Sequence, residues 1–374
     1  HNPLYKKNSK MKEQGQQKRQ CMRRFKKIIT LTTGIYCSLV ATWSAAEQEI
    51  DWQQAKQASS ISMTNQQVEF IKQKKLTAAM AWHGASPWIS AVSRGASDTF
   101  EMLGVKVVAS TDAQFDPAKQ VADLENITAL KPNILLSLSV DGISTMQSYQ
   151  KALQNGSQLV LLSNPIPGFV HGKDYVGIVT DDMFGMGKEA AISIRKAFGD
   201  NAKIGMIFHD AQYFITNNRD DAFRKEIAKS KGLDIVIEKG FVKEHETSAI
   251  AAAMILQHPK LDVIYVSWDA AAEGVIEALR SFGNRDIKVV THDLGVNNLL
   301  DMAMHGNMLA TISDRPYVIG ATMAKLGALA TLGESAPHFT LVPYDAVTHE
   351  NIAEIWQDAF KAPLPKMLDL ALKQ

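Results

Sequence analysis

Cysteine is scarce in this sequence, which has two among its 374 residues, Cys21 and Cys37. Both lie upstream of Glu47, where we expect the mature protein to begin. A mature chain without thiols has no disulfide, no cysteine-ligated metal and no cysteine nucleophile. Its stability must therefore come from packing, and residues 47–374 are long enough for about two domains.

Catalytic and cofactor motifs are also missing. The sequence has no G-x-S-x-G nucleophile elbow, no H-E-x-x-H zinc motif and no phosphate-binding loop. The pair Gly185 and Gly187 lacks the third glycine of a dinucleotide fingerprint. His83, His209 and His292 have no metal-ligand spacing. We therefore predict a protein that is not an enzyme and that uses no cofactor and no metal.

The net charge of +1 hides a strong asymmetry. Residues 1–46 hold ten lysines and arginines and one glutamate, a net charge of +9, and residues 47–374 hold 30 bases and 38 acids, a net charge of −8. The acidity of the mature chain argues against nucleic acid as a partner, because contacts with phosphates need a basic face.

The N-terminal segment has the three parts of an export signal. The basic run 22–27 precedes the apolar run 28–40, and Ser44-Ala45-Ala46 offers small residues for cleavage. We expect translation to start at Met22, residues 1–21 to be an upstream extension, and the mature chain to be periplasmic. A single membrane anchor is the alternative, although the apolar run is shorter than the ~20 residues of a span.

After a polar, weakly helical stretch at 47–75, strand and helix patterns alternate. Most predicted strands are continuous apolar runs, which suit a parallel sheet covered on both faces. Such alternation predicts a doubly wound α/β fold, and two successive sets, at about 70–181 and 182–313, predict two similar lobes. The predicted strands are 77–82, 105–110, 134–140, 158–163, 175–180, 203–209, 233–238, 261–268, 287–292 and 308–313. The predicted helices are 87–103, 117–130, 143–153, 184–198, 217–230, 247–257, 270–282 and 298–305.

Ligands of open α/β sheets bind beyond the carboxyl ends of the strands. The residues there combine aromatic rings with fixed polar groups, a combination that suits sugars and polyols. The candidates from these strand ends are Trp82, His83, Ser86, Trp88, Ser163, Asn164, His209, Trp268, Asp293 and Asp314.

Each candidate also has an ordinary structural explanation. Trp82 and Trp268 could fill the core. Asp269 and Asp293 could cap the helices that follow them. Arg219 could be a solvated helix residue, and the charged run 243–246 is expected to be a solvent-facing loop.

Seven segments in order resemble periplasmic sugar-binding proteins of the ribose-binding type, over about residues 76–348. They are 86–96, 116–120, 180–182, 219–223, 258–274, 289–293 and 310–314. The first corresponds to the Asn-Pro-Phe-Phe segment of the family, and the last to its Ala-Thr-Ile-x-Gln crossover.

The resemblance implies two Rossmann-like lobes, joined by a three-crossing hinge, that close on a ligand and deliver it to an ABC permease. It implies hinge crossings near 181–183, 314–315 and 342–347. The lobes would be 76–181 with 315–341, and 182–314 with 342–374. The implied ligand-binding positions are Ser86, Trp88, Ile89, Ser163, Asn164, Arg219, Trp268, Asp293 and Asp314.

Several of these positions differ from the family pattern. Ser163-Asn164 replaces an Asp-Arg pair, Trp268 replaces an Asn, and Asp314 replaces a Gln. A different polyol, a deoxy sugar or another small polar molecule is therefore expected rather than ribose. His83 and His209 are candidates for that altered specificity.

We thus predict a monomeric periplasmic solute-binding protein of an ABC importer that captures a sugar or polyol. The alternative is a periplasmic protein that reports its ligand to a chemoreceptor or sensor kinase.

Overall fold

The computed structural model describes residues 54–374. The predicted upstream extension, the export signal and residues 47–53 lie outside this part of the chain. Within it, no helix combines the length and the apolar character that crossing a membrane requires.

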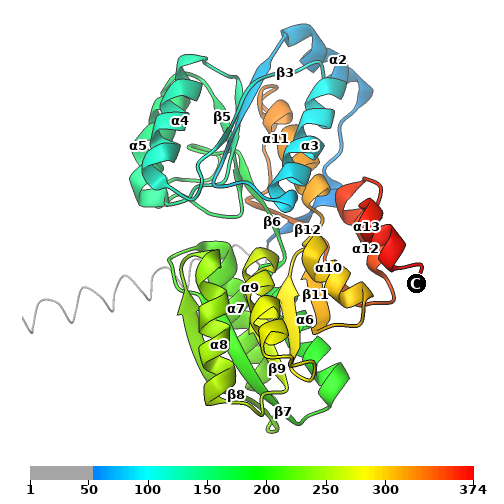
Figure 1. The fold of residues 1–374 in the computed structure, drawn as a ribbon. Helices are drawn as coiled ribbons and strands as arrows, with labels where there is room; N and C mark the ends of the chain where they lie inside the picture. Colours follow the sequence, from blue (N-terminus) through cyan, green and yellow to red (C-terminus); the bar gives the residue numbers. More distant parts are fainter. Residues whose placement is uncertain (1–53) are drawn as a thin grey trace, which may run out of the picture. The chain divides into compact units, whose positions relative to one another are not determined.

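The first sheet has seven strands, in the order β1-β12-β6-β5-β4-β2-β3, and every neighbouring pair is parallel (Figure 1). The strands are β1 (Lys56–Gln57), β2 (Thr77–Trp82), β3 (Lys106–Asp112), β4 (Ile134–Ser137), β5 (Gln158–Leu162), β6 (Gly177–Asp181) and β12 (Phe339–Val342). Helices α3 (Pro87–Met102) and α11 (Pro316–Ala330) pack together beside this sheet, and α4 (Pro117–Ala129) packs with α5 (Gly142–Gln154). We call this sheet and its helices lobe 1.

The second sheet has six strands, in the order β13-β11-β10-β9-β7-β8, of which only β13 is antiparallel to its neighbour. The strands are β7 (Ala202–His209), β8 (Leu233–Phe241), β9 (Val263–Val266), β10 (Lys288–His292), β11 (Met308–Ser313) and β13 (Asp345–Val347). Its helices are α6 (Met183–Phe198), α7 (Phe214–Ile227), α8 (Thr247–Gln257), α9 (Asp269–Ser281) and α10 (Val296–Ala303), with the 3-10 turn η2 (Glu244–Glu246). We call this sheet and its helices lobe 2.

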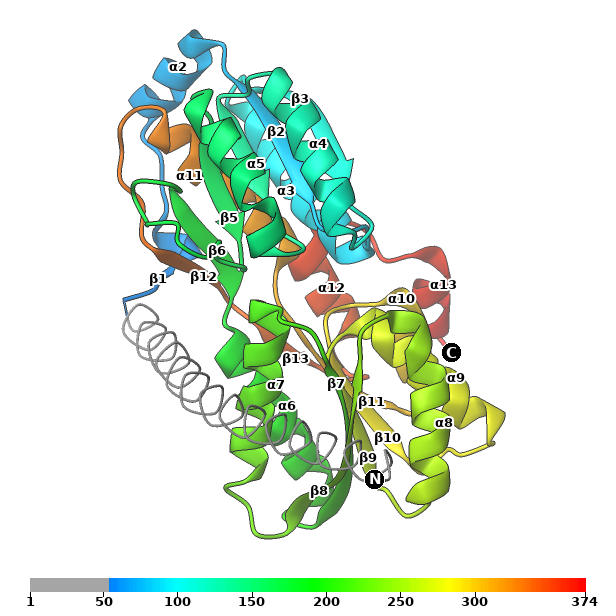
Figure 2. The same ribbon diagram turned by 90° about the vertical axis from the view of Figure 1, so that its left-hand side faces the viewer.

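The chain passes between the two sheets three times. It leaves lobe 1 after β6, returns from β11 to α11, and leaves again between β12 and β13 (Figure 2). Two doubly wound lobes with three crossings confirm the predicted fold class. The residue boundaries predicted for the lobes stay a prediction.

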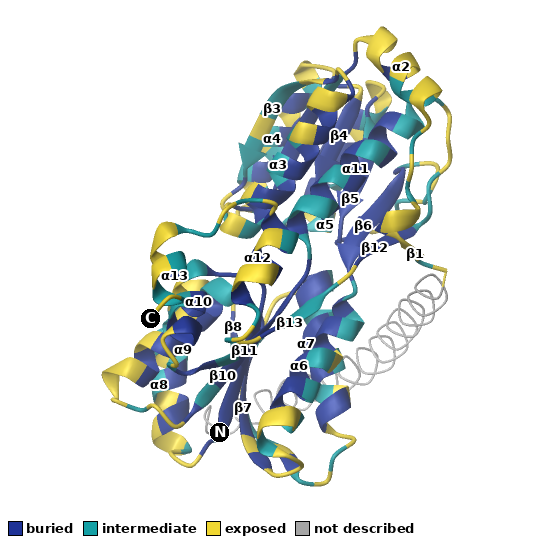
Figure 3. Ribbon diagram, turned by 90° about the vertical axis from the view of Figure 1, so that its right-hand side faces the viewer, coloured by how far each residue is buried: buried dark blue, intermediate teal, exposed yellow. Residues whose placement is uncertain are grey.

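The central strands of both sheets are buried along most or all of their length, as their apolar runs predicted, whereas β3 and β8 at the sheet edges are more exposed (Figure 3). In lobe 2 an apolar cluster lies on each face of the sheet, one with α6 and α7 and the other with α8, α9 and α10. This double covering is the physical reason that the strands read as continuous hydrophobic runs.

Glycines allow two pairs of helices to touch backbone to backbone. A Cβ atom at Gly95 in α3 would overlap the carbonyl oxygen of Tyr317 in α11. A Cβ at Gly187 in α6 would overlap the carbonyl oxygen of Arg219 in α7. Both contacts fix helices that carry residues at the carboxyl ends of the strands.

Some predicted boundaries shift in ways that matter for function. The strand predicted at 261–268 ends at Val266, so Trp268 leaves the sheet and takes the N-cap position of α9. The strand predicted at 134–140 ends at Ser137. The helix predicted at 217–230 runs from Phe214 to Ile227, one turn earlier.

The segments before β2 and after α11 were predicted only coarsely. Helix α2 (Asn65–Lys74) begins with a capping box between Thr64 and Gln67, and β1 with the 3-10 turn η1 (Ala58–Ser60) precedes it. Two short helices, α12 (Ile352–Phe360) and α13 (Lys366–Ala371), follow β13. Apolar residues of α12 and α13 join the lobe 2 core, which also includes Ala91 of α3.

Candidate functional site

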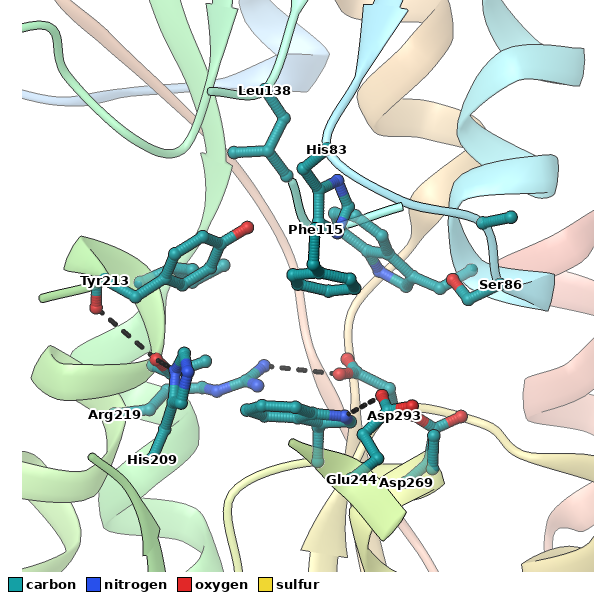
Figure 4. A pocket seen from close by; sticks show the side chains of 16 residues that line it. His83, Ser86, Phe115, Leu138, His209, Tyr213, Arg219, Glu244, Asp269 and Asp293 are labelled. Atoms are coloured by element: carbon teal, nitrogen blue, oxygen red, sulfur yellow. Dashed lines mark hydrogen bonds and ion pairs between the residues drawn. The ribbon is translucent and has the colours of Figure 1, made fainter. Parts of the chain in front are cut away.

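A cavity of about 90 Å³ lies where the carboxyl ends of strands from both lobes meet (Figure 4). Lobe 1 contributes residues that follow β2, β3 and β4, and lobe 2 contributes residues at or after β7, β9 and β10. Its lining combines four large aromatic side chains with imidazole, guanidinium and carboxylate groups. The aromatic residues are Trp88, Phe115, Tyr213 and Trp268.

The start of α3 places the lobe 1 side of the cavity. Ser86 is the N-cap, and its hydroxyl accepts a hydrogen bond from the backbone N–H of Ile89 at 3.2 Å. This cap fixes the start of α3 at Pro87, and Trp88 in the first turn of the helix lines the cavity. Its indole N–H donates to both carboxylate oxygens of Asp314, at 2.9 and 3.0 Å.

His83 follows β2 and is held against Phe115, with ring centroids 4.8 Å apart and the rings nearly perpendicular. Gly84 permits this approach, because a side chain there would overlap the Phe115 ring. Burial lowers the pKa of His83 to about 4, so the imidazole is neutral at physiological pH. Its Nδ1 atom is buried and has no hydrogen-bond partner among the described residues.

His209, the last residue of β7, is held on the lobe 2 side. Its Nδ1 lies 2.7 Å from the hydroxyl of Thr216, and its ring meets the Trp268 ring edge-on with centroids 4.8 Å apart. Burial lowers its pKa to about 4 as well. A neutral imidazole at this point can donate or accept one hydrogen bond without carrying charge.

Arg219 projects from α7 into a buried ionic cluster and is only 3% exposed. Its Nη1 atom lies 3.4 Å from Asp181 Oδ2 and 3.5 Å from Asp293 Oδ2, and its Nη2 donates to the Ser267 carbonyl at 3.0 Å. Burial raises the pKa of Asp181 to about 7, against the opposing effect of Arg219. Burial also raises the pKa of Asp293 and Asp314.

Asp293 follows β10 in a left-handed backbone conformation, with φ of 70°. A positive φ is strained for aspartate, and such strain concentrates at binding and catalytic sites. The hydroxyl of Thr311 donates to its carbonyl at 2.6 Å and holds it in place. Its carboxylate faces the cavity, and Oδ1 has no hydrogen-bond partner among the described residues (Figure 4).

The structure brings together seven of the twelve predicted site residues. These seven line the cavity: His83, Ser86, Trp88, His209, Arg219, Trp268 and Asp293. Asp314 lies directly behind Trp88, and Ile89 is buried in the first turn of α3. Trp82 is buried at the end of β2 and is not among the residues that line the cavity.

Ser163 and Asn164 lie at the end of β5 and do not line the cavity. The Ser163 hydroxyl lies 2.9 Å from that of Thr180, and the side-chain oxygen Oδ1 of Asn164 accepts from the backbone N–H of Ile215 at 3.3 Å. That second bond joins lobe 1 to the start of α7. Asn164 therefore connects the lobes directly.

Three of the open alternatives are decided by burial and capping. Arg219 is buried, so it is not a solvated helix residue. Asp293 does not cap α10, whose N-cap is Gly295. Asp269 lies in the first turn of α9, after the N-cap Trp268.

The charged run 243–246 faces solvent, as predicted, but Glu244 also has a second role that the sequence did not indicate. This exposed side chain lines the cavity and accepts a hydrogen bond from the Trp268 indole at 2.6 Å. Sequence reasoning also missed Phe115, Leu138 and Thr216 as lining residues. The residues beyond the predicted strand 105–110 were not considered, although those beyond other strands were. The same analysis there would have identified Phe115.

Comparison with known proteins gives concordant matches. A family model described as a periplasmic binding protein domain matches residues 78–335. The ribose import binding protein of Escherichia coli (strain K12) is 25% identical over 236 residues, which cover 63% of this chain and 78% of that protein. The D-allose-binding periplasmic protein of the same strain is 24% identical over 274 residues, covering 70% and 88%.

Solved structures share the fold. An ABC transporter solute binding protein from Agrobacterium vitis, bound with alpha-D-tagatopyranose, superposes with a TM-score of 0.70 at 19% identity, covering 76% of this chain and 99% of that one. A solute binding protein from Bacillus halodurans with bound myo-inositol gives a TM-score of 0.67 at 19% identity, covering 75% and 97%.

Proposed function

The chain belongs to the periplasmic binding protein domain family, and on that premise we propose that it captures a small sugar or polyol between its lobes. The observation that carries the proposal is the cavity itself. Residues from both lobes line it, and they combine ring faces with polar atoms that have no partner within the described chain. Ring faces cover C–H surfaces, and such polar atoms are available to hydroxyl groups.

Capture works through the hinge. A ligand that contacts both lobes binds the closed arrangement better than an open one, and therefore shifts the population toward closure. From lobe 1 the ligand would meet His83, Trp88 and Phe115. From lobe 2 it would meet Trp268 and Asp293. Relatives that carry the names of sugar-binding import proteins support this assignment.

The partner is then the permease of an ABC importer, which would receive the ligand from the closed monomer at the periplasmic face of the membrane. Reporting the bound state to a chemoreceptor or sensor kinase is the alternative. Ligand-dependent stimulation of ATP hydrolysis by the transporter encoded beside this protein would support delivery. Ligand-dependent autophosphorylation of a neighbouring kinase would support reporting.

Thermal unfolding against sugars, polyols, sugar acids and amino acids tests the binding function. The purified protein is first unfolded and refolded to remove bound ligand. A ligand that binds the native state raises the melting temperature, because it stabilises that state. The stabilisation is about 2.7 kcal/mol when the ligand concentration is 100 times its Kd.

Trp268→Ala and Asp293→Asn should abolish the shift. The matched control is Asp221→Asn, which removes an exposed carboxylate of α7 outside the cavity and should keep the shift. A panel without any shift, or a shift that survives both cavity variants, would contradict the proposal.

A further inference from the structure

Carboxylates outnumber cations around the cavity. Asp269 and Asp293 line it, and Asp181 and Asp314 lie directly behind its wall; all four are at or just beyond the ends of β6, β9, β10 and β11. Among the residues described as lining the cavity, Arg219 is the one permanent cation. His83 and His209 do not offset this excess, because burial keeps both imidazoles neutral.

One guanidinium cannot compensate all of this charge. The Nη1 atom of Arg219 contacts both Asp181 and Asp293, at 3.4 and 3.5 Å, and its Nη2 atom donates a hydrogen bond to a backbone carbonyl. Within residues 54–374, the one hydrogen-bond donor to the Asp314 carboxyl group is the neutral indole N–H of Trp88, and Asp314 is only 1% exposed. A buried carboxylate with a neutral donor and carboxylate neighbours is expensive to ionise.

One carboxylate oxygen of this acidic group faces the cavity and can accept a hydrogen bond from a ligand. Oδ1 of Asp293 is buried, faces the cavity and lacks a partner in the described chain (Figure 4). The side chain is held by its neighbours, because Oδ2 contacts Arg219 and the Asp293 carbonyl accepts from Thr311. Nδ1 of His83 is a second buried atom without a partner, across the cavity in lobe 1.

The aromatic lining favours the same kind of ligand. Trp88, Phe115, Tyr213 and Trp268 surround the position that Asp293 Oδ1 faces. The faces of aromatic rings carry negative potential, and they attract cations most strongly where water is excluded.

We propose that the ligand is a small hydroxylated molecule carrying one protonated amine, an amino sugar or amino polyol, with its ammonium group at Asp293 Oδ1. The proposal rests on the binding function given above and specifies its ligand class. The hydroxyl groups would meet His83 and His209, and the ring faces would cover the carbon skeleton.

The state of the carboxyl groups agrees with this assignment. Burial and mutual repulsion raise the pKa of Asp314 well above its usual value and that of Asp181 to about 7. The cluster therefore retains protons when no cation is present. An ammonium ion supplies the missing positive charge, whereas a neutral sugar does not.

The test uses ligand pairs that differ only in an amine in place of a hydroxyl. The pairs are D-glucosamine with D-glucose, 1-amino-1-deoxy-D-sorbitol with D-sorbitol, and 2-amino-1,3-propanediol with glycerol. Isothermal titration calorimetry on the refolded full chain at pH 7.5 gives each Kd. In a pair that binds, the amine should bind at least about tenfold tighter.

Asp314→Asn separates charge from shape. The variant keeps an oxygen that can accept from Trp88 but removes a carboxyl group that can ionise when the ammonium group binds. It should weaken the amine by about tenfold and leave its neutral partner unchanged or tighter. Asp221→Asn removes an exposed negative charge from α7 and should keep the tenfold preference.

The outcomes are distinguishable. If neutral members bind as tightly as amines, the amine proposal falls and sugar binding stands. If Asp314→Asn weakens both members of a pair equally, Asp314 acts through structure and the proposal falls. If no pair binds and no sugar shifts the melting temperature, both the ligand class and the binding function are wrong.

Discussion

Replacing Arg219 with methionine should destabilise the protein in a pH-dependent manner. The change keeps an apolar stem of similar length and removes the guanidinium that faces Asp181 and Asp293, at 3.4 and 3.5 Å. Removing one member of a buried ion pair costs about 3–5 kcal/mol, because it leaves buried charge uncompensated. With an unfolding entropy of about 2.1 cal/mol/K for each residue, that corresponds in a chain of this size to a fall in melting temperature of roughly 4–8 °C.

The dependence on pH follows from Asp181, whose pKa is about 7 beside Arg219. Without Arg219 its pKa rises further, so in the variant the carboxyl stays protonated where the parent ionises. Each pH unit in that range adds about 1.4 kcal/mol to the deficit. The variant should therefore lose about 1.4 kcal/mol more at pH 8 than at pH 6, where the parent carboxyl is also protonated.

Urea unfolding of parent and variant at both pH values measures the effect. Adding Asp181→Asn to Arg219→Met should recover part of the loss, and the double-mutant cycle gives the coupling between the pair. The control is Arg224→Met in the same helix, where a half-buried arginine pairs with Asp221 and Glu238. That change should cost no more than about 1 kcal/mol. An equal loss at pH 6 and pH 8 would refute the reasoning and assign the cost to packing.

Two further predictions concern stability. Gly95→Ala should lower the free energy of unfolding in urea by about 1–3 kcal/mol, because its methyl group would push α11 away from α3. Ser97→Ala in the same helix is the control and should be nearly neutral. A neutral Gly95→Ala would contradict the close contact between the two helices. The melting temperature should rise as pH falls from 8 to about 6.5, since the raised pKa of Asp181 makes stability fall as pH rises through 7. Below pH 6.5 the lowered pKa values of His83 and His209, about 4, oppose that gain, because the unfolded chain then takes up protons that the fold excludes. A melting temperature that increases from pH 6.5 to 8 would contradict this assignment.

The architecture could be predicted because the buried strands appear in the sequence as short apolar runs that alternate with helical patterns. Runs such as Val263–Val266 are apolar on both faces, and buried parallel strands need that composition. The three crossings between the lobes were predicted from the resemblance of seven ordered segments to proteins of the ribose-binding type. The C-terminal helices α12 and α13 were not predicted, because they are short and take their stability from packing against lobe 2.

The site could be predicted as far as the strand ends could be located. Trp268 and Asp293 were found because each follows an apolar strand, and Arg219 was found because the segment 219–223 resembles a helix motif of the ribose-binding type. Glu244 was missed because its role depends on Trp268, which approaches it from a segment 24 residues away. Asp314 was placed in the cavity, but the Trp88 ring lies in front of it. Contacts of that kind are decided by packing, and the local sequence does not encode them.

The C-terminal helices affect how the lobes can separate. Trp356 and Phe360 of α12 share a buried apolar cluster with lobe 2 residues and with Ala91 of α3, and Arg94 of α3 donates a hydrogen bond to the carbonyl of Phe360. Parting the lobes along this edge would expose apolar surface to water, at about 25 cal/mol for each Å². Any opening that parts α12 from α3 therefore carries this cost, whether or not a ligand is bound. A substitution in α12 that reduces the buried apolar surface would lower the cost of opening, and it would thereby change the apparent affinity from outside the cavity.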